Sequence, residues 1–261
     1  MNSLLSYACA AGLAVCALPS CIAQSPWNGT WKENAAKSKL TGDTITYTSK
    51  GDGAFHYTNG ATVEYDFACD GKPHPTIADR TVTCTGSAAD GYDFTYMAHG
   101  VVLSKSRRTF SPNGAMMMIH GTATRPDSTS FDYDETYKRL SGGKDLAGKW
   151  LDVKDKSGSD NVMVMSIKGD MLHIDEPAYK EVIDAKLDGS DGTATGPTVP
   201  PGAGLSYKAE NPTKIHFAFR LDGKVISEGT YTLNPDGKSY TEEVWVPGKE
   251  SEKATILFEK Q

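Results

Sequence analysis

The sequence has no concentrated cluster of basic residues and no apolar run long enough to cross a membrane. Its 261 residues include 27 Lys and Arg against 33 Asp and Glu, which gives a formal net charge of −6. Nucleic-acid binding needs a concentrated basic surface, so we expect no nucleic-acid partner. The nearest approach to such a cluster, Lys105, Arg107 and Arg108, is typical of a solvated strand edge. A spanning helix needs about 20 apolar residues, so we expect no membrane span.

The N-terminal segment has the features of a targeting signal. The first 31 residues contain no charged side chain, and residues 4–18 are predominantly apolar. The small residues Cys21 and Ala23 follow, in the −3 and −1 positions of a cleavage site. We therefore predict a signal peptide at 1–23 and an exported protein, periplasmic or secreted. Alternatively, Leu18–Cys21 resembles a lipobox, and the protein would then be lipid-anchored at Cys21.

Cysteine is scarce, with five residues in all, three of them inside the predicted signal peptide. The other two are Cys69 and Cys84, and an even number in an exported chain predicts one disulfide. Residues 70–75 contain a glycine and two prolines, so the chain must turn back there. Neighbouring antiparallel strands could then bring the two α-carbons within bonding range. The alternatives are a metal pair, which would need two further ligands, and two free thiols.

Three short motifs occur twice in the same order, with about 120 residues between the members of each pair. They are Gly29–Trp31 with Gly148–Trp150, Thr109–Gly114 with Thr230–Gly237, and Tyr137–Arg139 with Phe258–Lys260. Internal similarity at one spacing indicates repeated structural units. We predict two similar domains, 24–142 and 143–261, which meet at a short glycine-containing linker.

Alternating apolar and polar residues predict strands throughout the chain, and helices have no comparable signal. The alternation is clearest in 61–69, 131–137 and 215–219, and Asn-Gly or Asp-Gly turns separate such runs. We expect eight or nine short strands in each half, and a long loop over 189–204. The predicted fold is all-β, with two tandem antiparallel β-barrel domains. The short linker allows either two closed barrels or one continuous sheet.

The Gly-x-Trp motif on a first strand, followed by hairpins and a basic residue near the last strand, resembles the lipocalin-like (calycin-type) barrels. The chain also resembles exported bacterial proteins built from two such domains. The resemblance implies that a basic side chain covers each tryptophan at the closed end of its barrel. Carried over to this sequence, it pairs Trp31 with Arg139 and Trp150 with Lys260.

Few residues point to chemistry. The six histidines include no pair with metal-ligand spacing, so we expect no metal site and no cofactor. Glu135 shares a strand face with aromatic residues, as does Glu242 in the second half, and a carboxyl group inside a barrel could act as an acid or base. His120 is a third candidate. The plainer interpretation is an ion pair for the glutamates and a wall or surface position for the histidine.

Three functions are compatible with these features. The first is an exported binding protein for a small apolar or amphipathic molecule, because a barrel of about eight strands can enclose one small ligand. The second is an enzyme of the hydratase, isomerase or cyclase kind acting on an apolar substrate, which requires Glu135, His120 and Glu242 to converge on one pocket. The third is an envelope protein that contacts other proteins and has filled barrels.

Overall fold

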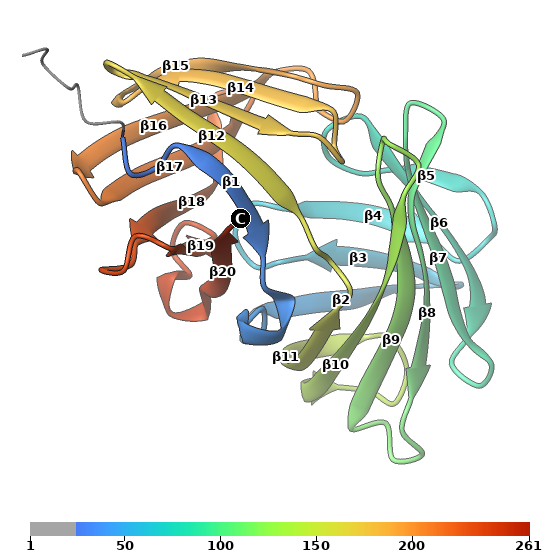
Figure 1. The fold of residues 1–261 in the computed structure, drawn as a ribbon. Helices are drawn as coiled ribbons and strands as arrows, with labels where there is room; N and C mark the ends of the chain where they lie inside the picture. Colours follow the sequence, from blue (N-terminus) through green and yellow to red (C-terminus); the bar gives the residue numbers. More distant parts are fainter. Residues whose placement is uncertain (1–24) are drawn as a thin grey trace, which may run out of the picture.

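The computed structural model describes residues 25–261, so the predicted signal peptide 1–23 and Cys21 lie outside the described residues. The regular secondary structure of this part is almost all β-strand, and it forms two antiparallel ten-stranded sheets that lie side by side (Figure 1). One sheet is a closed barrel and the other is a barrel with one open seam. The prediction of an all-β fold with two antiparallel barrels is confirmed. Within residues 25–261, no helix is both long enough and apolar enough to cross a membrane.

The closed barrel contains the first strand and the last nine. In barrel order these are β1 (Gly29–Glu33), β12 (Val162–Lys168), β13 (Met171–Glu176), β14 (Glu181–Lys186), β15 (Asp188–Thr195), β16 (Ala203–Asn211), β17 (Lys214–Leu221), β18 (Lys224–Leu233), β19 (Ser239–Trp245) and β20 (Ala254–Lys260). The predicted long loop over 189–204 is wrong, because β15 and the start of β16 occupy most of it.

The open barrel contains the other ten strands, which begin at one edge with β4 and end at the other with β5. In sheet order they are β4 (Glu64–Ala68), β3 (Ala54–Thr58), β2 (Thr44–Gly51), β11 (Gly148–Ser157), β10 (Ser130–Gly142), β9 (Met116–Thr124), β8 (Val101–Phe110), β7 (Gly91–Ala98), β6 (Arg80–Ser87) and β5 (Pro73–Pro75). Two single-turn 3-10 helices, η1 (Ala35–Lys37) and η2 (Glu250–Glu252), lie in connections.

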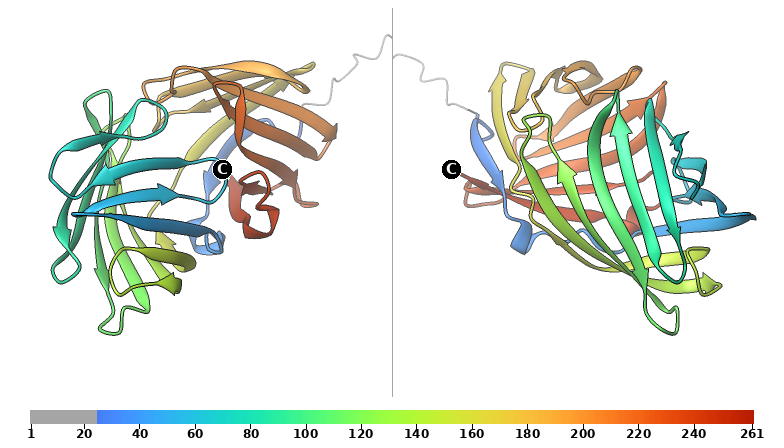
Figure 2. Two further views of the ribbon diagram at one scale, coloured as in Figure 1. Left: turned by 180° about the vertical axis from the view of Figure 1, so that it is seen from behind. Right: turned by 90° about the vertical axis from the view of Figure 1, so that its right-hand side faces the viewer.

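The first strand of each repeat pairs with the strands of the other repeat. Strand β1 lies between β12 and β20 of the closed barrel, and β11 lies between β10 and β2 of the open barrel (Figures 1 and 2). Each predicted domain, 24–142 and 143–261, therefore contributes its first strand to the sheet that holds the rest of the other. Neither sheet is built from one continuous half of the chain.

This exchange reverses the expected contacts of the two tryptophans. The Arg139 guanidinium lies 3.9 Å from the ring centre of Trp150, and the Lys260 ammonium lies 4.9 Å from that of Trp31. The expected pairs, Trp31 with Arg139 and Trp150 with Lys260, are wrong. Both tryptophans are fully buried. A basic side chain lies over each ring, as the resemblance implies, but the partners are exchanged.

The glycine two residues before each tryptophan leaves space for the basic side chain that lies over the ring. Gly29 and Gly148 both have positive φ angles, 145° and 152°. A Cβ on Gly29 would lie 2.6 Å from the Lys260 side chain, and one on Gly148 would lie 2.5 Å from the Ser141 carbonyl oxygen and 2.7 Å from the Arg139 guanidinium. The Gly-x-Trp motif thus keeps room for the basic side chain above the ring.

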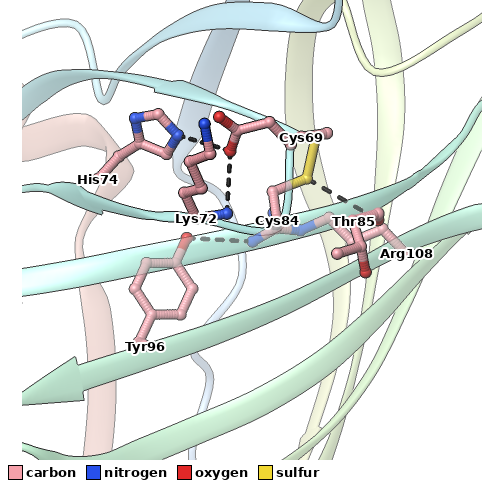
Figure 3. Close-up of a disulfide and its surroundings, with 8 residues drawn as sticks. Cys69, Lys72, His74, Cys84, Thr85, Tyr96 and Arg108 are labelled. Atoms are coloured by element: carbon pink, nitrogen blue, oxygen red, sulfur yellow. Dashed lines mark hydrogen bonds and ion pairs between the residues drawn. A yellow bond between two sulfur atoms is a disulfide. The ribbon is translucent and has the colours of Figure 1, made fainter.

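The disulfide between Cys69 and Cys84 is confirmed, with the two α-carbons 4.3 Å apart. The bond (Figure 3) joins Cys69, directly after the edge strand β4, to Cys84 in β6, the neighbour of the opposite edge strand β5. It therefore crosses the open seam, and the prediction that neighbouring paired strands bring the two cysteines together is wrong. The backbone N–H of Gly71 also donates to the Cys84 carbonyl at 3.0 Å. The seam is therefore closed covalently where the strand ladder is interrupted.

Removing the cation over Trp150 should destabilise the protein more than removing the cation over Trp31. Arg139 donates to three backbone carbonyls at 2.6–2.7 Å, whereas Lys260 donates to one at 3.1 Å. We expect Arg139→Met to lower the free energy of unfolding by about 2 kcal/mol and Lys260→Met by about 0.5 kcal/mol. Urea unfolding of both variants measures the difference. Equal losses would contradict the assignment of the carbonyl contacts as the stabilising feature.

Candidate functional site

The open barrel encloses a cavity of about 410 Å³, which is within the range of small-molecule sites. Its wall is rich in tyrosine because alternate residues of the strands face inward. The tyrosines are Tyr47, Tyr57, Tyr65, Tyr96, Tyr133 and Tyr137. Two of them meet across the seam, where the hydroxyl groups of Tyr65 on β4 and Tyr96 on β7 are 3.1 Å apart. The cavity thus has an aromatic wall with hydroxyl groups in it.

A buried arginine faces this cavity. Arg108 on β8 is only 6% exposed, and its guanidinium lies 3.5 Å from the ring centre of Phe94. One nitrogen, Nη2, donates to the Tyr96 hydroxyl at 3.4 Å (Figure 3). Among residues 25–261, Nε and Nη1 have no hydrogen-bond partner. A buried charge without a partner is costly, so this guanidinium is available to an anion that enters the cavity.

Glu135 lines the same cavity from β10. Strand β9 lies between the two charged residues, and its Ile119 pairs in register with both Arg108 and Glu135. Two strand spacings separate their backbones by roughly 9–10 Å. Burial, together with the nearby negative charge of Asp155, raises the pKa of the Glu135 carboxyl to about 7. Asp43, which also lines the cavity, has a raised pKa because it is desolvated.

The other two predicted site residues lie elsewhere. His120 is on the outer face of the open barrel, where its Nδ1 is 2.8 Å from Asp134 and both side chains are exposed. Glu242 is in the closed barrel. The three candidates Glu135, His120 and Glu242 therefore do not converge on one pocket. The structure supports the plainer interpretation of His120 as a surface residue.

The closed barrel is filled by its own side chains to a greater extent than the open barrel is. Its core contains Trp31, Tyr207, Phe217, Tyr231 and Tyr240, all nearly inaccessible to solvent. A cavity of about 300 Å³ at its margin is lined by Glu176, Glu181 and Phe219, and by Arg80 from the open barrel.

Arg80 also lines the larger cavity, so the two hollows adjoin at this side chain.

Arg108 was expected to lie on a solvated edge with Lys105 and Arg107, and this is wrong for Arg108. Lys105 and Arg107 are exposed, whereas Ser106 and Arg108 are buried, as alternation along β8 requires. Arg107 forms an ion pair with Asp93 on the outer face at 2.7 Å. Phe110 packs against the core, so alternation in steps of two would have predicted that Arg108 faces inward and Arg107 outward.

No protein-family model matches the chain, and no curated protein or solved structure has significant similarity to it.

Proposed function

We propose that the protein binds a small amphipathic anion in the cavity of the open barrel. The anionic group contacts Arg108, and the apolar part of the ligand lies against the tyrosine wall. The observation that carries this proposal is the buried guanidinium with two unpartnered nitrogens among the described residues, at a cavity of about 410 Å³. A carboxylate would supply the missing hydrogen bonds and neutralise the charge.

Binding is favoured over catalysis because only one of the three candidate acid or base residues, Glu135, lines this cavity. We also propose that the protein is exported and acts in the periplasm or outside the cell. The disulfide supports this location, because such bonds persist in oxidising compartments.

Arg108→Met should weaken the binding of simple carboxylates. We expect hexanoate, octanoate or dodecanoate to bind the wild-type protein, and the variant to lose about 2 kcal/mol of affinity, roughly 30-fold, for the best of them. Isothermal titration calorimetry measures both affinities. Because methionine retains contact with Phe94 and removes an unpaired buried charge, the variant should be at least as stable as the wild type.

The matched control is Arg107→Met, the neighbouring residue on the outer face. It removes the same charge from the protein but leaves the cavity unchanged, so it should bind carboxylates as the wild type does. Equal losses for both variants would mean that net charge, and not the cavity, determines affinity. No binding of any carboxylate to the wild type would contradict the proposed function.

A further inference from the structure

We propose that the cavity has a second, acidic pole at Glu135 and Asp43, and that its ligand is bipolar, with an anionic group at one end and an ammonium group at the other. This inference rests on the proposed function and adds the chemical class of the ligand. It predicts that a molecule with both groups binds better than the carboxylate alone.

Within residues 25–261, the two opposite charges of Arg108 and Glu135 face one cavity without forming an ion pair. The only hydrogen bond of the Arg108 guanidinium within residues 25–261 is to Tyr96, and Nε and Nη1 have none. Ile119, 4% exposed, lies between Arg108 and Glu135 in the strand register. An apolar residue thus separates the poles, and each pole can contact its own group on the ligand.

Carboxylates outnumber cations around Glu135. From β11, Asp155 lies opposite Glu135 in the strand register, and Asp152 is close enough to raise its pKa further. Asp43 adds a third negative charge from the residue before β2. Arg108 on β8 opposes these charges, and Arg80 on β6 also lines the cavity. An ammonium group would offset part of the remaining repulsion.

Lys249, in the connection between β19 and η2, is a cation that acts on Asp43, and it already has partners. Its ammonium lies 2.5 Å from Glu252 and donates to the carbonyls of Thr44 and Asn59 at 3.1 and 2.9 Å. It lowers the pKa of Asp43, but burial outweighs this effect and the Asp43 pKa remains raised. The carboxyl groups of Glu135 and Asp43 can therefore still bind a cationic group of the ligand.

Uncharged titratable groups also border the pole. Tyr47 on β2 and Tyr137 on β10 are neutral at pH 7, because burial and nearby carboxylates raise their pKa values. The carboxyl of Glu135, with a pKa of about 7, is about half protonated at neutral pH. An ammonium group beside it favours the ionised form. Binding at pH 7 should therefore release about half a proton per ligand.

The experiment compares 6-aminohexanoate, 8-aminooctanoate and 12-aminododecanoate with the alkanoates of the same length. Calorimetric titrations at pH 7 in two buffers of different ionisation enthalpy give both the affinity and the protons released. For the length that best fits the cavity, the amino compound should bind at least about tenfold tighter than its alkanoate and release protons. The alkanoate of that length should release none.

Glu135→Gln should greatly reduce both the affinity difference within a pair and the proton release, because glutamine does not ionise and only Asp43 of the pole remains. The matched control is Asp134→Asn, the neighbour on the same strand, whose exposed carboxylate pairs with His120 on the outer face. This control should retain both effects. Thermal unfolding of each variant establishes that it is folded.

The outcomes separate the two proposals. If alkanoates bind through Arg108 and the amino compounds bind no tighter at any length, the acidic pole is wrong and the proposed function stands. If neither series binds the folded wild type, both are wrong. If the amino compounds bind tighter but Glu135→Gln leaves the difference unchanged, the ammonium group is bound elsewhere and the second pole is wrong.

Discussion

Breaking the Cys69–Cys84 disulfide is expected to lower the free energy of unfolding by about 3 kcal/mol, the chain-entropy value for a 15-residue loop. The bond spans 15 residues in sequence and joins Cys69, directly after the edge strand β4, to Cys84 in β6, the neighbour of the opposite edge strand β5. Backbone pairing is interrupted between these edges, so the loss of the bond should also let the seam open. Urea unfolding with and without dithiothreitol measures the stability.

Reduction should also weaken ligand binding, because the seam passes beside the proposed site. The hydroxyl contact between Tyr65 and Tyr96 crosses the seam, and Tyr96 is the residue that accepts a hydrogen bond from Arg108. If the edges separate, the guanidinium loses this contact and the cavity loses part of its wall. Calorimetric titration of the reduced protein with the best carboxylate tests this link between stability and binding.

The double variant Cys69→Ala/Cys84→Ala provides the control for side effects of the reductant. It should match the reduced wild-type protein in stability and should not respond to dithiothreitol. Cys84 is fully buried, so part of the variant's loss could come from packing. A variant much less stable than the reduced wild type would indicate packing as the larger cause, and an unchanged stability on reduction would contradict the prediction.

The strands and the disulfide were predictable because they depend on local signals. Period-two alternation identifies the inward face of a strand wherever one face is buried and the other is exposed to solvent. The glycine predicts the turn that brings Cys69 back towards Cys84. The two prolines were expected to exclude a strand, but Pro73–Pro75 form the edge strand β5, where prolines are tolerated. Strand β15 was missed because its sequence, DGSDGTAT, has the composition of a loop. It pairs with β14 and β16, so tertiary pairing overrides local preference.

The exchange of first strands could not be read from the repeats, because both copies carry the same motif. On this motif alone, either first strand, β1 or β11, could pair with either last strand, β10 or β20. The deciding factor is chain connectivity, since only residues 143–147 separate β10 from β11. Consecutive antiparallel strands with a short connection usually pair, and this pairing places Trp150 beside Arg139. Strand β1 is then left to close the other barrel beside Lys260.

The candidate site was predictable only in part. Alternation along β10 placed Glu135 on an inward face, and the structure brings it to the cavity. His120 and Asp134 could have been recognised as an outward pair only from the register of β9 with β10. The importance of Arg108 depends on two guanidinium nitrogens, Nε and Nη1, that have no hydrogen-bond partner within residues 25–261, and this is a property of tertiary structure.

A second large effect is expected from pH, through Glu242 in the closed barrel. Burial, reinforced by the negative charges of Glu176 and Glu33, raises the pKa of its carboxyl from 4.5 to about 8. Its register neighbours on β18 and β20 are Tyr231 and Ile256, which offer no positive charge. The folded state therefore holds Glu242 protonated at neutral pH.

The sign of the effect follows from this raised pKa. Below pH 4.5 the carboxyl is protonated in both the folded and the unfolded chain, so it costs nothing. Between pH 4.5 and about 8 the unfolded chain releases the proton while the folded protein retains it, so the free energy of unfolding falls as pH rises. The total loss from this group should be on the order of 4 kcal/mol. Glu176, whose pKa burial raises to about 7, adds to the fall within the same range.

Glu242→Gln should remove much of this dependence, because glutamine has the same shape and no proton to lose. The variant should be more stable than the wild type at pH 8 by on the order of 3 kcal/mol, and the two proteins should converge near pH 4.5. Glu243→Gln is the matched control, because that carboxylate forms an ion pair with Lys253 at 2.6 Å and should show no stabilisation. Urea unfolding across this pH range measures all three proteins. If wild type and Glu242→Gln lose stability in parallel, the carboxyl is ionised in the folded barrel and the acidic interior does not limit stability.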